Sequence, residues 1–294
     1  MNVAAGKKAQ YRKSGWIFIS IAVILALVFL LYPIIYSIVL SFHSTRGLTS
    51  TFAGFGNIER LLKDKILFRA LYNNFVFLIF QVPIMLTLGL IFAVMLNSTK
   101  LRFKSFYRLA LFLPCVTSLV AYSVLFKMIF QIDGIINTVL LNIHLISSPI
   151  NWLNDPFWAR VTIIIALCWR WTGYNMMFYL SGLQNISRDS LEAADIDGAG
   201  KIRRFFYIIV PQLKPVILFT TIMSTIGTIQ LFDEVVNLTA GGPSNATLTI
   251  SQYIYNHSFV YASNFGYSAA LSYVIVIIVS VLAYIQFKVA GDDN

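Results

Sequence analysis

Six long apolar runs constrain the fold of this chain more than any other feature of its sequence. They cover Trp16–Leu40, Phe75–Leu96, Leu109–Phe126, Val161–Leu183, Val216–Phe232 and Tyr267–Phe287. A hydrocarbon core about 30 Å thick is crossed by about 20 apolar residues in an α-helix. The runs are continuously apolar rather than apolar at every second residue, which excludes the strands of a membrane β-barrel. The sequence therefore predicts an all-α, polytopic membrane protein with six helices in one bundle.

Composition excludes a water-soluble globule. Hydrophobic residues make up 58% of the 294 residues and charged residues 12%, against about 25% charged in ordinary soluble domains. The net charge of +10 is interpreted as a topology signal rather than as a nucleic-acid footprint. Cys115 and Cys168 lie inside apolar runs, so no disulfide framework is expected.

Lysine and arginine residues collect in alternate loops, which predicts the orientation of the chain. They lie before the first run (Lys7, Lys8, Arg12, Lys13), between the second and third (Lys100, Arg102, Lys104) and between the fourth and fifth (Arg188, Lys201, Arg203, Arg204, Lys214). The loops 131–157 and 238–264 contain none. The positive-inside rule then places both termini in the cytoplasm. We expect a cytoplasmic tail over residues 1–15, one membrane domain over 16–288 and a second cytoplasmic tail over 289–294.

One loop does not follow this rule. Residues 43–69 carry Arg46, Arg60, Lys63, Lys65 and Arg69, although the other loops place this segment outside. Apolar residues recur at helical spacing over residues 58–71. This spacing predicts an amphipathic helix on the outer membrane surface.

The basic loop between the fourth and fifth runs is expected to form two short helices. Asp189 and Glu192 are spaced like a capping box that opens a helix over residues 191–196. Asp197 and Gly198 then supply a turn in which a positive φ costs little.

The second of these helices begins after Gly200 and is expected to end at Pro211. Its apolar residues Phe205, Ile208 and Ile209 share one face, and its basic residues lie on another. An ordinary basic loop at the membrane surface would show the same amphipathic character.

Residue spacing in this loop resembles the EAA loop of binding-protein-dependent ABC importer permeases. The matching residues are Glu192-Ala193-Ala194, Gly198, Ile208 and Val210-Pro211. Asp197-Gly198-Ala199, Phe205 and Pro215 narrow the resemblance to the carbohydrate-uptake class, such as the maltose and glycerol-phosphate permeases. Leu238–Pro243, Tyr253, Tyr255, Phe259 and Gly266–Ala270 are similar to the outer loop and last span of the maltose-permease-F-like subunit.

The resemblance implies a type I ABC importer permease bundle whose EAA loop, residues 189–214, docks on a separate ATPase. It assigns the coupling role to Glu192 and Gly198, supported by Ala193, Ala194, Asp197 and Phe205. It also implies partners: a second, maltose-permease-G-like subunit, two ATPase subunits and an extracytoplasmic sugar-binding protein. The expected function is ATP-driven import of a di- or oligosaccharide across the inner membrane of a bacterium.

The sequence shows no nucleotide-binding, metal-binding or catalytic motif. Gly198-Ala199-Gly200-Lys201 lacks the first glycine and the final Ser or Thr of a Walker A loop, so ATP would be bound by the partner subunits and no cofactor is expected. His43, His144 and His257 show neither metal-ligand spacing nor a nucleophile motif. We therefore expect no enzymatic activity.

Three other classes of membrane protein would share part of this pattern. A mitochondrial-type carrier would carry a threefold repeat of about 100 residues, which is missing here. An intramembrane hydrolase would need a catalytic motif at membrane depth. A facilitator working without an ATPase is disfavoured only by the EAA loop.

Polar and aromatic residues at mid-membrane depth indicate a sugar site. At about 1.5 Å per residue, the midplane falls near residue 170 in the fourth run and near residues 225–228 in the fifth. The side chains at this depth are Trp169, Arg170, Trp171, Ser224 and Thr228. A buried arginine avoids lipid, so it is expected to face a wet cavity or a partner. Alternatively, Arg170 pairs with Asp233 or Glu234.

Overall fold

The computed structural model describes residues 15–16, 18–46, 49–98 and 101–291. Lys7, Lys8, Arg12, Lys13 and Lys100 lie outside the described residues, as do residues 292–294. The chain forms two compact units, residues 1–63 with 254–273 and residues 64–253 with 274–294. The predicted membrane domain over 16–288 and its two tails remain predictions.

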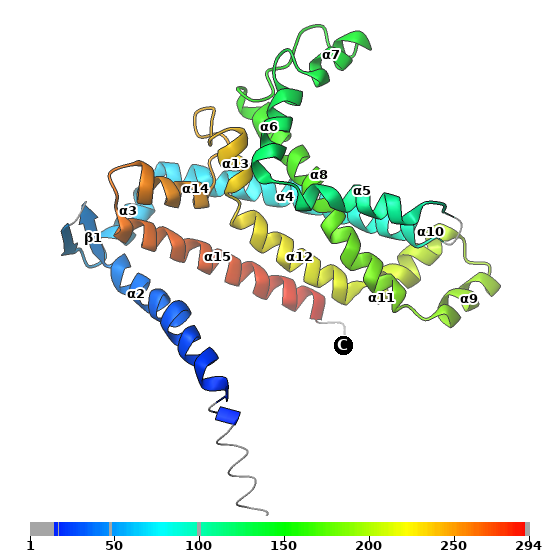
Figure 1. The fold of residues 1–294 in the computed structure, drawn as a ribbon, viewed down its shortest axis with the longest axis horizontal. Coiled ribbons are helices and arrows are strands. Elements are labelled where there is room, and N and C mark those ends of the chain that lie inside the picture. Colours follow the sequence, from blue (N-terminus) through cyan, green and yellow to red (C-terminus); the bar gives the residue numbers. More distant parts are fainter. Residues whose placement is uncertain (1–14, 17, 47–48, 99–100, 292–294) are drawn as a thin grey trace, which may run out of the picture. The chain divides into compact units, whose positions relative to one another are not determined.

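Helices dominate the described part of the chain (Figure 1), which confirms the predicted all-α architecture. Four are long and apolar enough to cross a membrane: Phe18–Ser41, Lys65–Asn97, Leu119–Asn142 and Phe265–Val289. Lys201–Gln212 and Lys214–Ile229, bent by 71° at their junction, make a fifth if they count as one span. Helix α8 (Pro156–Gln184) has sufficient length but is not among these, and it contains Arg160 and Arg170. The count of six spans remains a prediction.

In the second unit, α4 (Lys65–Asn97) packs along α8, with α5 (Lys104–Val116) and α12 (Lys214–Ile229) beside them (Figure 1). A Cβ atom at Gly89 of α4 would lie only 3.2 Å from the backbone nitrogen of Met176 in α8. The absence of a side chain therefore allows the two backbones to approach closely, as small residues do between membrane helices.

The predicted third span, Leu109–Phe126, is wrong as a single helix. Helix α5 ends at Val116, and α6 (Leu119–Phe130) begins after a break. Thr117 has extended backbone with ψ of 149°, and its hydroxyl donates to the carbonyl oxygen of Pro114 at 2.7 Å. This local bond satisfies a carbonyl at the end of α5 and stabilises the break.

An apolar core of the second unit includes the part of the chain that follows this break. It joins residues of α4, α6, α8 and α13 (Asp233–Leu238). Its buried members are Phe77, Tyr122, Phe126, Phe130, Trp152, Ile163, Ala166, Leu167, Leu231, Val235 and Leu238. Helix α7 (Ile135–Asn142) follows α6 and packs on the rim of this core.

The first unit contains a small sheet that the sequence analysis did not predict. After η1 (Leu27–Leu31) and α2 (Tyr32–Ser41), strands β1 (His43–Arg46) and β2 (Thr49–Phe52) pair antiparallel. The unit also contains η3 (Asn256–Val260), part of α14 (Ile250–Tyr255) and the beginning of α15 (Phe265–Gly291).

The amphipathic helix predicted over residues 58–71 is divided in two. Helix α3 (Gly56–Lys63) ends before Asp64, and α4 begins after it. The Asp64 carboxylate accepts hydrogen bonds from the backbone nitrogens of Ile66 and Leu67 at 2.9 and 3.1 Å. This N-cap starts a new helix in the middle of the apolar periodicity.

Candidate functional site

A cavity of about 330 Å³ lies between α4, α8 and α12. Its lining consists of aromatic, amide, hydroxyl and apolar groups and includes no charged side chain. The lining residues are Gln81, Met85, Leu167, Trp171, Tyr174, Asn175, Met223, Ser224, Gly227, Thr228 and Leu231. Three of the predicted sugar-site residues, Trp171, Ser224 and Thr228, are thus brought together at one cavity.

Hydrogen bonds between and within helices hold the polar wall of this cavity. The Thr228 hydroxyl donates to Oε1 of Gln81 at 2.8 Å, which connects α12 to α4. The Ser224 hydroxyl lies 3.4 Å from Oδ1 of Asn175, and Nδ2 of Asn175 donates to the carbonyl oxygen of Trp171 at 3.1 Å. Amides and hydroxyls beside aromatic rings suit a ligand that is rich in hydroxyl groups and uncharged.

Arg170 does not line the cavity. Its Nε lies 3.8 Å from Oε1 of Glu234, and the two side chains are 10% and 8% exposed. Its Nη2 donates to the carbonyl oxygen of Thr117 at 3.4 Å. The alternative ion pair named from the sequence therefore forms with Glu234, while Asp233 is exposed.

The two tryptophans beside Arg170 differ in their surroundings. Trp171 donates its indole N–H to Oε1 of Glu234 at 3.2 Å, so Glu234 contacts both Arg170 and a cavity residue. Trp169 stacks on Tyr122 with ring centroids 5.8 Å apart and does not line the cavity. The sugar-binding roles proposed for Trp169, Arg170, Trp171, Ser224 and Thr228 remain predictions.

Sequence reasoning missed Gln81 and Asn175, which line the cavity, and named Glu234 only as a partner for Arg170. A signal existed, because polar residues inside long apolar runs are costly in a membrane and often functional. Gln81 and Asn175 are 3% exposed, which leaves their amides to the cavity and to neighbouring helices. Among the described residues, no group of three His, Cys, Asp or Glu side chains could hold a metal ion.

A second candidate site is the loop between α8 and α12. Helix α9 (Arg188–Ile196) begins earlier than predicted, because the Ser187 hydroxyl accepts from the backbone nitrogen of Ser190 at 3.5 Å. Asp189 therefore lies inside the first turn rather than capping it. Glu192 is exposed and Ala194 is buried, while Ala193 belongs to the same helix.

The turn predicted at Asp197 and Gly198 is confirmed. Gly198 has φ of +71°, and the backbone nitrogen of Ala199 donates to the carbonyl oxygen of Ala194 at 2.9 Å. This is the Schellman arrangement, in which a glycine in the left-handed region ends a helix. The turn sets the angle between α9 and the helix that follows it.

The helix after this turn passes Pro211, contrary to the prediction. It comprises α10 (Lys201–Arg204), η2 (Phe205–Ile209) and α11 (Val210–Gln212), and it bends by 71° into α12. Phe205 and Ile209 pack against apolar residues of α4 and α8. Phe205 therefore anchors the loop to its own bundle.

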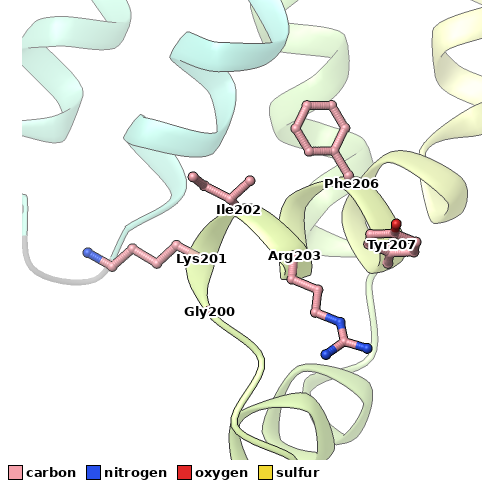
Figure 2. A pocket seen from close by; sticks show the side chains of 6 residues that line it. All are labelled: Gly200, Lys201, Ile202, Arg203, Phe206 and Tyr207. Carbon is pink, nitrogen blue, oxygen red and sulfur yellow. The ribbon is translucent and has the colours of Figure 1, made fainter.

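The other side of this helix exposes an apolar surface. Ile202, Phe206 and Tyr207 are 76%, 60% and 77% exposed. They line an open hollow of about 710 Å³ together with Gly200, Lys201 and Arg203. Figure 2 shows these side chains pointing outward from the helix in different directions. Clustered exposed apolar side chains on a basic loop are typical of a contact surface.

The chain is similar to known membrane transport proteins over most of its length. Residues 60–289 match the model of the family described as binding-protein-dependent transport system inner membrane component. The lactose transport system permease protein LacF of Rhizobium radiobacter is 55% identical over 97% of this chain and 96% of its own length. The arabinooligosaccharides transport system permease protein AraP of Halalkalibacterium halodurans is 34% identical over 94% of this chain and 87% of its own.

The same architecture occurs in a solved structure. One chain of the bacterial alginate ABC transporter, crystallised in complex with its alginate pentasaccharide-bound periplasmic protein, superposes with a TM-score of 0.82. It is 19% identical, and the match covers 98% of this chain and 96% of that one. This chain belongs to the family of binding-protein-dependent transport system inner membrane components, and it is a multi-pass membrane transport protein rather than an enzyme.

Proposed function

We propose that this chain is a permease subunit of an ATP-driven importer of an uncharged di- or oligosaccharide. The observation that carries the proposal is the cavity between α4, α8 and α12, which is lined by aromatic rings, amides, hydroxyls and apolar side chains, without a charged side chain. Its Trp171 ring and its hydroxyl groups on Ser224 and Thr228 match the stacking and hydrogen bonding that a sugar requires. The similarity to a lactose permease over nearly the whole chain supports this substrate class.

The proposed assembly contains a second permease subunit, two ATPase subunits and an extracytoplasmic sugar-binding protein. A second permease is proposed because importers of the type that this chain resembles enclose their pathway between two such bundles. The alginate transporter, crystallised with its periplasmic protein, has the same fold and supports the binding-protein partner. The exposed Ile202, Phe206 and Tyr207 supply a surface on which an ATPase subunit could dock.

Reconstitution of the complete assembly in proteoliposomes tests this function. We expect sugar-dependent uptake only when ATP, the ATPase subunits, both permeases and the binding protein are present. Each omission should reduce uptake to the background of empty vesicles, since coupling and delivery are then lost. Uptake by this chain alone would contradict the proposal and favour the facilitator.

The proposed orientation places both termini and residues 189–214 in the cytoplasm. The support is the distribution of basic residues, because the loops 131–157 and 238–264 contain none. In intact cells, Lys201→Cys should resist a membrane-impermeant thiol reagent, whereas Asn245→Cys should react. The native Cys115 and Cys168 lie in helices, and the unsubstituted chain serves as the control for their labelling. The reverse pattern would contradict this orientation.

A further inference from the structure

A cavity of about 490 Å³ lined mainly by polar residues lies in the first compact unit, whereas the sugar site and the coupling loop belong to the second. Two segments that are far apart in the sequence build it. Its lining residues are Thr45, Arg60, His257, Tyr261, Ala262, Ser263 and Asn264. In the proposed orientation these segments lie on the outer side of the membrane.

Arg60 is held in place at this cavity by an aromatic ring. Its guanidinium carbon lies 3.8 Å from the centroid of the Tyr267 ring, and Tyr267 is fully buried. His257 packs edge-on against the same ring at 5.0 Å. A flexible surface arginine loses rotamer entropy when it binds a ligand, and stacking on a fixed ring reduces that loss.

The wall opposite is fixed by hydrogen bonds. The Thr45 hydroxyl donates to Oδ1 of Asn264 at 3.4 Å and accepts from the backbone nitrogen of Gly266 at 3.1 Å. The Asn264 side chain also accepts from the backbone nitrogen of Tyr267 at 3.0 Å. The cavity is therefore a formed site with polar walls rather than a gap between mobile loops.

Arg60 is in neither of the ion pairs seen among the described residues, which join Lys63 to Glu59 and Arg170 to Glu234. Glu59, its neighbour in the sequence, pairs with Lys63 instead. The surrounding loop is also rich in basic residues on the side of the membrane where the positive-inside rule disfavours them. Orientation in the membrane therefore does not explain this charge.

We infer that this cavity receives a carboxylate side chain of the extracytoplasmic sugar-binding protein, with Arg60 as the central contact. The inference rests on the proposed function for the partner and for the orientation. A planar guanidinium binds a carboxylate through two parallel hydrogen bonds. A cavity of this volume with hydroxyl and amide walls fits an inserted side chain better than a flat layer of lipid headgroups.

Titration of the complete transporter in nanodiscs with sugar-loaded binding protein tests this assignment. The readout is the binding-protein concentration that gives half-maximal stimulation of ATP hydrolysis. Arg60→Gln should raise that concentration about tenfold, the effect of losing one charge-assisted hydrogen-bonded pair, and should weaken its dependence on salt. Arg60→Lys retains the charge without the planar fork and should fall between Arg60→Gln and the wild type.

Lys63→Gln is the matched control, because Lys63 lies on the same helix and pairs with Glu59. It should leave the half-maximal concentration unchanged. Values for Arg60→Gln within about twofold of the wild type, below the effect of one charged hydrogen bond, would overturn the inference. So would an Arg60→Gln effect that vanishes when phosphatidylcholine replaces phosphatidylglycerol, since a lipid phosphate would then be the occupant. A wild-type transporter that its binding protein does not stimulate would contradict the proposed function itself.

Discussion

Gly198→Pro is expected to lower sugar uptake by at least about 100-fold while the permease still inserts into the membrane. Gly198 has φ of +71°, whereas proline is confined to φ near −65°, and a misplaced proline costs about 3 kcal/mol or more. The hydrogen bond from Ala199 to Ala194 would be lost with the turn. The direction of α9 would change, so the contact proposed between Glu192 and the ATPase would be lost. Uptake and stimulated ATP hydrolysis in proteoliposomes measure this loss of coupling.

Two further variants test whether the effect of Gly198→Pro comes from the lost turn or from any change in the loop. Gly200 has φ of −60°, and a Cβ atom there would meet nothing within 4 Å, so Gly200→Pro should couple nearly normally. Glu192→Lys reverses an exposed charge and should uncouple transport without altering the helix. Wild-type coupling in Gly198→Pro would contradict the role proposed for residues 189–214.

Much of the loop between α8 and α12 could be predicted from the sequence, because its turn depends on neighbouring residues. The turn at Gly198 was predictable because a helix C-terminus followed by Asp-Gly strongly favours a left-handed residue. The end of the second helix was not, because the π-turn Phe205–Ile209 closes with a bond from Val210 to Phe205. Such a turn shifts the hydrogen-bond register ahead of Pro211, so the proline continues the helix.

Long apolar runs located the membrane helices but could not locate breaks inside them. The run Leu109–Phe126 contains Pro114, Thr117, Ser118 and Ser123 among its apolar residues, and a hydropathy average over the run does not show where the helix breaks. The backbone nevertheless becomes extended at Thr117. Similarly, the apolar spacing across residues 58–71 concealed the N-cap at Asp64.

Depth in the membrane predicted the level of the sugar site but not the direction of each side chain. Consecutive residues on a helix point about 100° apart, so Trp169, Arg170 and Trp171 cannot all face one cavity. Of these three, Trp171 lines it. Without an amphipathic pattern, the inner face of a long apolar helix cannot be read from the sequence, so the polar residues Gln81 and Asn175 could not be assigned to the same cavity as Trp171.

Arg170→Ala is expected to destabilise the permease by about 3–5 kcal/mol, because it leaves Glu234 buried without its cation. The Arg170 and Glu234 side chains are 10% and 8% exposed, so both charges are largely removed from water. Removing both charges in the double variant, Arg170→Ala with Glu234→Ala, should recover much of this stability. Asp233→Asn is the control, since Asp233 is exposed and should tolerate the change. The midpoint of thermal unfolding of the purified permease measures each effect.

Thr228→Val tests sugar binding independently of the ion pair between Arg170 and Glu234. The substitution nearly preserves side-chain volume but removes the hydroxyl that donates to Gln81 at 2.8 Å. We expect about a tenfold higher half-saturating sugar concentration, as for the loss of one or two hydrogen bonds, with a destabilisation of about 1–2 kcal/mol at most. If Arg170→Ala instead left stability intact and changed only the sugar dependence, Arg170 would be a sugar contact. Glu234 would then hold Trp171 alone, through the bond to its indole N–H.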